Sequence, residues 1–154
     1  MRPLVFGLSL LVLVAGCGEE EPIPLSEYRD RANAICRENN TEGRAEVNQL
    51  RERLEAGGEL EPDDLAELNG KVLELLREGH DRLADIPPPD EKADAAEAYE
   101  QQVLKQNDAF AELVDAQQDG SDAELLEASD RNEALTQDVK DAAGDLGLDE
   151  CAGN

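Results

Sequence analysis

Aromatic side chains are scarce in this chain of 154 residues, which has no tryptophan, two tyrosines and two phenylalanines. Phe6 lies in a segment that we expect to be removed, so Tyr28, Tyr99 and Phe110 are the rings that remain. Three rings so far apart in the sequence do not suggest the stacking platform on which bases or sugars are bound. The composition therefore argues against recognition of ligands by stacking.

Histidine is scarcer still, since His80 is the only one. Zinc hydrolases built on paired histidines and serine triads without another base are excluded. Di-iron bundles need a glutamate three residues before each of two histidines, and Arg77 occupies that position here. His80 falls between Leu76 and Leu83, as a boundary residue of a helix would. We expect no enzymatic activity, no catalytic residue, no metal ligand and no cofactor.

Positive charge is also low, with 14 lysines and arginines against 38 acidic residues and a formal charge of −24. Nucleic acid is therefore an unsuitable partner, because its binding depends on cationic side chains. The acids are uneven: residues 22–56 carry a net charge of −1, and residues 57–154 carry −21. Three interpretations stay open: neutralisation between helices, solubility alone, or an acidic surface for a basic protein partner or divalent cations.

Long apolar runs are absent except for the eleven residues from Leu4 to Val14. As a helix this run reaches about 16 Å, roughly half the hydrocarbon thickness of a bilayer, so it is too short for a permanent span. A short basic start, Met1-Arg2-Pro3, precedes it, and the small residues Ala15-Gly16 follow. This order is typical of a secretion signal.

The residues Leu13-Val14-Ala15-Gly16-Cys17 resemble the lipobox of bacterial lipoproteins. The resemblance implies that residues 1–16 are a signal peptide and that Cys17 is lipidated, with palmitate-type chains, as the first mature residue. Residues 17–25 would then form a tether, and two or more acyl chains would anchor the protein stably. Gly18 replaces the aspartate that retains lipoproteins at an inner membrane. The alternative is an ordinary cleaved signal followed by a chance cysteine.

Residues 26–154 predict four helices in one domain. The first runs from an N-cap at Ser26 to about Ala56, with a kink or break allowed at the polar stretch 37–44. The others begin at Pro62, at about Asp90 and after the capping box at Ser121, and they end before Pro87, at about Gln118 and at Gly147. Because the connections are short, we expect an all-α, single antiparallel up-down-up-down four-helix bundle.

Apolar positions at helical spacing predict the inward faces of these helices. In the first and last segments they are Tyr28, Ala32, Ile35, Cys36, Val47, Leu50, Leu54, Leu125, Leu126, Leu135, Val139, Ala142 and Leu146.

Cys36 and Cys151 remain once Cys17 is assigned to lipid, and an exported chain can form disulfides. In an up-down-up-down bundle the end of the fourth helix lies beside the start of the first, so the two cysteines can meet. The alternative is two free thiols.

The segments Ala32-Asn33-Ala34-Ile35-Cys36 and Leu146-Gly147-Leu148-Asp149-Glu150-Cys151 look like those of small secreted helical proteins and lipoproteins of high-G+C bacteria. This resemblance supports the disulfide and implies no chemistry. We therefore expect a lipid-anchored extracytoplasmic helical protein that acts as a binding or envelope-interaction module. It would be held by Cys17 at the outer face of the cell membrane, or at the outer membrane where the cell has one. The alternative is a lipoprotein that binds divalent cations through acidic helical faces.

Overall fold

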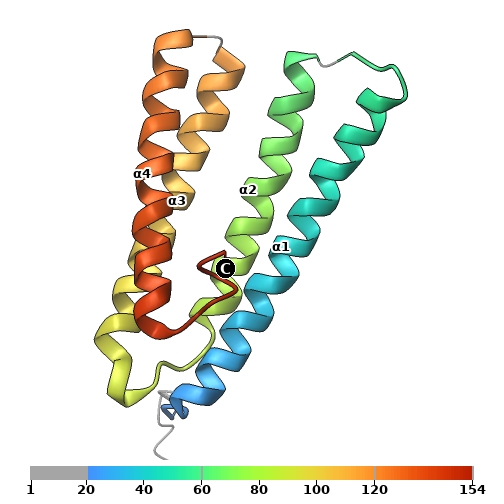
Figure 1. Ribbon diagram of the computed structural model, residues 1–154. Coiled ribbons are helices and arrows are strands. Elements are labelled where there is room, and N and C mark those ends of the chain that lie inside the picture. The colour runs from blue at the N-terminus through green and yellow to red at the C-terminus, as the bar shows by residue number, and fades with distance from the viewer. Residues whose placement is uncertain (1–20, 60, 120, 154) are drawn as a thin grey trace, which may run out of the picture.

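The computed structural model describes residues 21–59, 61–119 and 121–153, so Cys17 and the expected signal peptide lie outside it. The described residues contain no strand and form four α-helices and one 3₁₀ turn (Figure 1): α1 (Leu25–Glu55), α2 (Pro62–Ala84), η1 (Asp90–Lys92), α3 (Ala93–Asp119) and α4 (Asp122–Leu146). The prediction of an all-α protein with four helices is confirmed.

Most helix ends lie where the turn and capping residues predict them. Pro62 is the first residue of α2, where a missing N–H costs no hydrogen bond. Ser121 caps α4, with its Oγ accepting from the Glu124 backbone N–H at 3.5 Å. Gly147 ends α4 in the left-handed conformation, with φ of 72°.

The predicted start of the first helix was wrong, and the question of a break at residues 37–44, which the sequence left open, is answered by a continuous helix. Helix α1 begins at Leu25 after Pro24, without a side-chain cap, rather than at a Ser26 cap. It also continues through residues 37–44. The one glycine in this stretch, Gly43, costs only about 1 kcal/mol in a helix. Two hydrogen bonds from this stretch offset that cost. Asn39 donates to the Leu75 carbonyl oxygen at 3.2 Å, and Asn40 donates to the Glu150 carbonyl oxygen at 3.0 Å.

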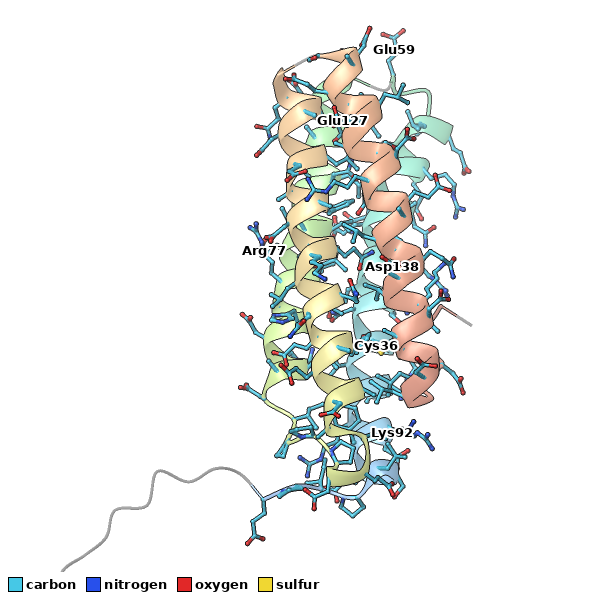
Figure 2. All side chains as sticks on the ribbon, turned by 90° about the vertical axis from the view of Figure 1, so that its left-hand side faces the viewer. Cys36, Glu59, Arg77, Lys92, Glu127 and Asp138 are labelled. Atoms are coloured by element: carbon cyan, nitrogen blue, oxygen red, sulfur yellow. A yellow bond between two sulfur atoms is a disulfide. The ribbon has the colours of Figure 1, made fainter. Side chains whose placement is uncertain are left out.

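Each helix packs closely against the next one along the chain, whereas α1 and α4 are not among the closely packed pairs. The start of α1, the end of α2, the start of α3 and the end of α4 lie at one end of the molecule, called here the tether end (Figure 1). Glu59 and Glu127 mark the opposite, distal end (Figure 2). In Figure 1, α1 and α4 approach each other at the tether end and diverge toward the distal end.

The continuous apolar core lies in the tether half of the bundle. Its buried members come from three helices, the linkers and the C-terminal tail: Tyr28, Ala32, Ile35, Ile86, Ala96, Tyr99, Val103, Val139, Ala143, Leu146, Leu148 and Ala152. Leu148 is the residue after the Gly147 cap and is fully buried, which is the hydrophobic contact expected of such a cap.

The inward faces predicted for the first and last helices were wrong at several positions in the distal half. Val47 is 51% exposed and Leu54 36% exposed, and Leu50 is only partly buried. Leu126 on α4 is 64% exposed. The physical reason is the divergence of α1 from α4: an apolar stripe at helical spacing is buried only where another helix covers it.

Candidate functional site

The C-terminal tail, residues 147–153, is attached to α1 in the tether half. The sulfur atoms of Cys36 and Cys151 are 2.02 Å apart, which is consistent with the expected disulfide. Beside it, the Glu150 backbone N–H donates to Asn33 Oδ1 at 3.0 Å. Figure 2 shows Cys36 within the bundle in this half. The tail thus joins the end of α4 to α1, two helices that are not among the closely packed pairs.

Next to this attachment lies a cavity of about 320 Å³ between the start of α1, the end of α2 and the start of α3. Its apolar wall comes mainly from Leu83, Ile86, Pro88, Ala93, Ala96 and Val103. Its polar lining comes from Tyr28, His80, Tyr99, Asp94, Glu97 and Glu100. Small-molecule sites have this composition, apolar surface with a few polar groups, and volumes from about 300 Å³ upward.

Local sequence explains how the lining residues reach the cavity. The three prolines 87–89 end α2 and turn the chain into η1, with Pro89 fully buried. This linker brings Leu83 and Ile86, at and after the end of α2, close to Ala96 and Val103 on α3. All four residues belong to the same core cluster or pack against it.

Both tyrosines are core residues as well as lining residues, with Tyr28 4% and Tyr99 3% exposed. Burial raises the pKa of both hydroxyls, and the charge of Glu100 raises that of Tyr28 further. The Tyr99 hydroxyl lies 4.0 Å from Cys36 Sγ, and it must be the donor because a disulfide sulfur carries no hydrogen. Tyr99 therefore connects the cavity wall to the disulfide.

His80 lines the cavity and has a ring nitrogen without a hydrogen-bond partner among the described residues. Its ring is only 13% exposed, and Nε2 is buried without a hydrogen-bond partner among the described residues. Glu100 Oε1 is 3.8 Å from Nε2, beyond hydrogen-bonding range. Nδ1 lies 3.4 Å from Asp81 Oδ1 at the surface. A buried polar atom without a partner costs free energy, so a ligand group bonded to Nε2 would recover it.

Negative charge dominates the polar lining. Asp94, Glu97 and Glu100 recur every three residues on α3 and so share one face of it. No lysine or arginine lines the cavity, and none forms an ion pair with these three carboxylates within the described part of the chain. The cavity therefore combines an apolar wall with uncompensated acidic groups.

Among the described residues, two depressions are larger than this cavity. One, of about 670 Å³, lies between the start of α1, the residues before it and η1. The other, of about 560 Å³ between the distal parts of α1 and α2, is lined mainly by charged side chains, several of which form ion pairs. Arg53 lies 2.7 Å from Asp64, and Lys71 lies 3.4 Å from Glu46. Exposed pairs of this kind are weak but satisfied. Of these three cavities in the described part of the chain, the one lined by Tyr28, His80 and Tyr99, called here the tether-end cavity, has both apolar surface and a buried polar atom without a partner.

The structure tests some of the site residues predicted from the sequence and not others. The structure brings Cys36 and Cys151 together, whereas Cys17 lies outside the described residues. The cavity was missed, and His80 was taken for a helix boundary residue. The sequence contained an indication of the cavity. Tyr28 is near the start of the first predicted helix, His80 near the end of the second and Tyr99 near the start of the third. Because the connections are short, these three residues come to the same end of the molecule.

The described residues contain neither a cluster of metal-ligating side chains nor a membrane-spanning helix. Across residues 21–59, 61–119 and 121–153, no three side chains among His, Cys, Asp and Glu converge to hold a metal ion. Over the same ranges, no helix combines the length and apolar character needed to cross a bilayer.

No protein-family model matches the chain, and neither a curated protein nor a solved structure is similar to it at a significant level.

Proposed function

We propose that this chain is a lipid-anchored, extracytoplasmic, non-enzymatic binding module whose site is the tether-end cavity. One observation carries the proposal: the half of the bundle that has a core and a disulfide also holds an apolar cavity with an unpaired buried polar atom. Disulfides persist mainly outside the reducing cytoplasm, which supports export.

Anchoring through Cys17 would hold the cavity close to the membrane. Seven residues separate Cys17 from Leu25, the start of α1, and span at most about 25 Å when fully extended. Tyr28, which lines the cavity, lies in the first turn of α1. The start of α1, which contributes to the cavity wall, would therefore lie within about 25 Å of the lipid surface.

We infer that the four helices form one antiparallel up-down-up-down bundle. Short connections and the close packing of each helix against the next support this arrangement. The tail then completes the contact between the first and last helices, which the disulfide fixes.

Binding suits the cavity better than catalysis. No serine, threonine or cysteine lines it, so a nucleophile of that type is missing from its wall. Its single histidine has no hydrogen-bonded orienting partner inside the cavity. The acidic surface of α2, α3 and α4 supports a second role for the module, contact with a basic protein partner of the envelope. No observation favours the divalent-cation alternative.

Metabolic labelling tests the proposed anchoring. We would express the full chain in a bacterium with an alkynyl palmitate analogue and compare it with Cys17→Ser, expecting loss of both label and membrane association. Cys151→Ser is the matched control, because it changes a cysteine by the same substitution and should keep the label. Protease added to intact cells or spheroplasts should digest the domain. Equal labelling of Cys17→Ser, or a fully protected domain, would refute the proposal.

A further inference from the structure

We propose that the tether-end cavity binds a protonated amine carried on a small apolar body, through His80 Nε2 and the Glu100 carboxylate. This inference rests on the proposed binding function and specifies its ligand class. The ligand would be an organic ammonium ion whose N–H groups donate to these two acceptors.

The charges that line the cavity favour a positively charged ligand. Asp94, Glu97 and Glu100 line the cavity, and its lining contains no lysine or arginine. An anionic ligand would meet three like charges, whereas an ammonium group would be attracted by all three. Glu100 is the closest of these to the histidine, with Oε1 at 3.8 Å from Nε2. Charge-assisted hydrogen bonds of this type are about twice as strong as neutral ones.

The geometry favours N–H donors over a quaternary ammonium group. Nδ1 lies 3.4 Å from Asp81 Oδ1, a carboxylate oxygen that accepts, so in the neutral ring Nδ1 carries the hydrogen and Nε2 is an acceptor. Nε2 has no hydrogen-bond partner among the described residues, so a donor from outside the chain can supply one. Glu100 Oε1 is also an acceptor, and its distance of 3.8 Å from Nε2 lets one ammonium group reach both atoms. A primary or secondary amine can supply the two N–H groups, whereas a quaternary nitrogen has none.

The volume and the apolar wall of the cavity determine the size and the polarity of the part of the ligand that carries the ammonium group. The cavity of about 320 Å³ corresponds to roughly ten water molecules at about 30 Å³ each. Leu83, Ile86 and Val103 form apolar surface within it. A body of about ten non-hydrogen atoms, aliphatic or with one aromatic ring, fits this space, and the tyrosine rings offer additional cation–π attraction.

The single histidine makes the test direct. The lipidated mature chain, purified through a tag without histidine in a nonionic maltoside detergent, gives one set of imidazole signals in a ¹H–¹³C spectrum, and these come from His80. Phenethylamine, protonated at neutral pH, is the probe. Matched compounds are neutral 2-phenylethanol, anionic 3-phenylpropanoate and phenethyltrimethylammonium, which has charge without N–H. Empty micelles correct for partitioning.

We expect a saturable shift of the His80 signals with phenethylamine. Both 2-phenylethanol and the quaternary analogue should bind at least about tenfold more weakly. The anion 3-phenylpropanoate should give no saturable shift. Glu100→Gln should weaken phenethylamine binding about tenfold, because it removes the charge and keeps the shape. Glu133→Gln, an exposed acid on α4 that does not line the cavity, is the matched control and should change little. By calorimetry, His80→Phe should reduce the preference for the amine over the alcohol, while the carboxylates keep part of it.

Equal affinity for amine and alcohol, an effect of Glu100→Gln no larger than that of Glu133→Gln, or the absence of a saturable shift would overturn the inference. Mass spectrometry of the same sample reports acylation of Cys17. An acylated chain that binds 2-phenylethanol as tightly as the amine would refute the ligand class while leaving the anchored binding function intact.

Discussion

Arg29, in the first turns of α1, donates a hydrogen bond from Nε to the Leu146 backbone carbonyl oxygen at 2.6 Å. The last four carbonyl groups of a helix lack partners within it, yet all four of α4 are satisfied. Lys92 donates to the Asp145 oxygen, and backbone N–H groups of Leu148 and Gly147 donate to Ala143 and Gly144. Figure 2 shows Lys92 beyond the end of α4. Two cations thus also stabilise the negative end of the α4 dipole.

This cap predicts opposite effects for two glycines three residues apart. Gly147→Ala should lower the free energy of unfolding by about 1–2 kcal/mol, because φ is 72° and a Cβ would lie 2.8 Å from Arg29 Nε. Gly144→Ala should raise it by about 1 kcal/mol, since that position is helical and nothing lies within 4 Å of a Cβ there. Urea unfolding measures both, and equal effects would argue against the cap.

The uneven core predicts a second contrast, within α4 itself. Leu146→Ala should cost about 2–5 kcal/mol, because the side chain is completely buried in the core cluster. Leu126→Ala should change the free energy of unfolding by less than about 0.5 kcal/mol, because Leu126 is 64% exposed. The substitution and the helix are the same, so thermal or urea unfolding isolates burial. A large loss for Leu126→Ala would mean that the distal half is covered in solution.

Helix ends could be predicted from the sequence because their causes are local. Pro62, Ser121 and Gly147 each act through the backbone geometry or hydrogen bonds of their own turn. The start of α1 was misplaced because Ser26 has the chemistry of a cap, while Pro24, with its fixed φ, occupies the N-cap position instead.

Burial in the distal half and the cavity could not be predicted, because both depend on how far helices diverge. Val47 and Leu54 have the spacing of core residues, but spacing gives only a shared face and not the presence of a neighbour that covers it. The unpaired nitrogen of His80 likewise results from its 3.8 Å separation from Glu100 on another helix. Periodicity contains no information about such a distance.

The continuity of α1 depends partly on a close approach to α2, which a double-mutant cycle can measure. A Cβ on Gly79 would lie 1.7 Å from Asn39 Nδ2, the group that donates to the Leu75 carbonyl. Gly79→Ala should therefore gain almost nothing, since about 1 kcal/mol of helix propensity is offset by a lost hydrogen bond. In an Asn39→Ala background it should stabilise by about 1 kcal/mol. Additive effects would show that the two residues do not meet.

Loss of the disulfide should affect stability at least as much as any of these changes. The bond joins residues 115 apart, and constraining such a loop is worth about 4–5 kcal/mol in the chain-entropy model. Reduction should therefore lower the urea midpoint strongly. In the Cys36→Ala/Cys151→Ala variant, which should already be destabilised, the same reductant should have no effect. Two alkylatable thiols at these positions in the native, non-reduced protein would refute the bond.

Alkaline pH should unfold the protein through its two tyrosines. Both have a pKa raised above the usual 10.0 by burial, so the folded state keeps protons that the unfolded state loses near pH 10. Stability from this source is complete below about pH 10 and falls as the pH rises further, because the unfolded state then binds fewer protons.

The chain has two tyrosines and no tryptophan, so tyrosinate absorbance reports these groups alone. We expect this absorbance to appear together with the loss of helical circular dichroism. In Tyr28→Phe, Tyr99 alone remains, and its signal should arise only on unfolding because it is 3% exposed and donates toward Cys36 Sγ. Complete ionisation of both tyrosines while the helical signal persists would contradict the burial that forms the cavity wall.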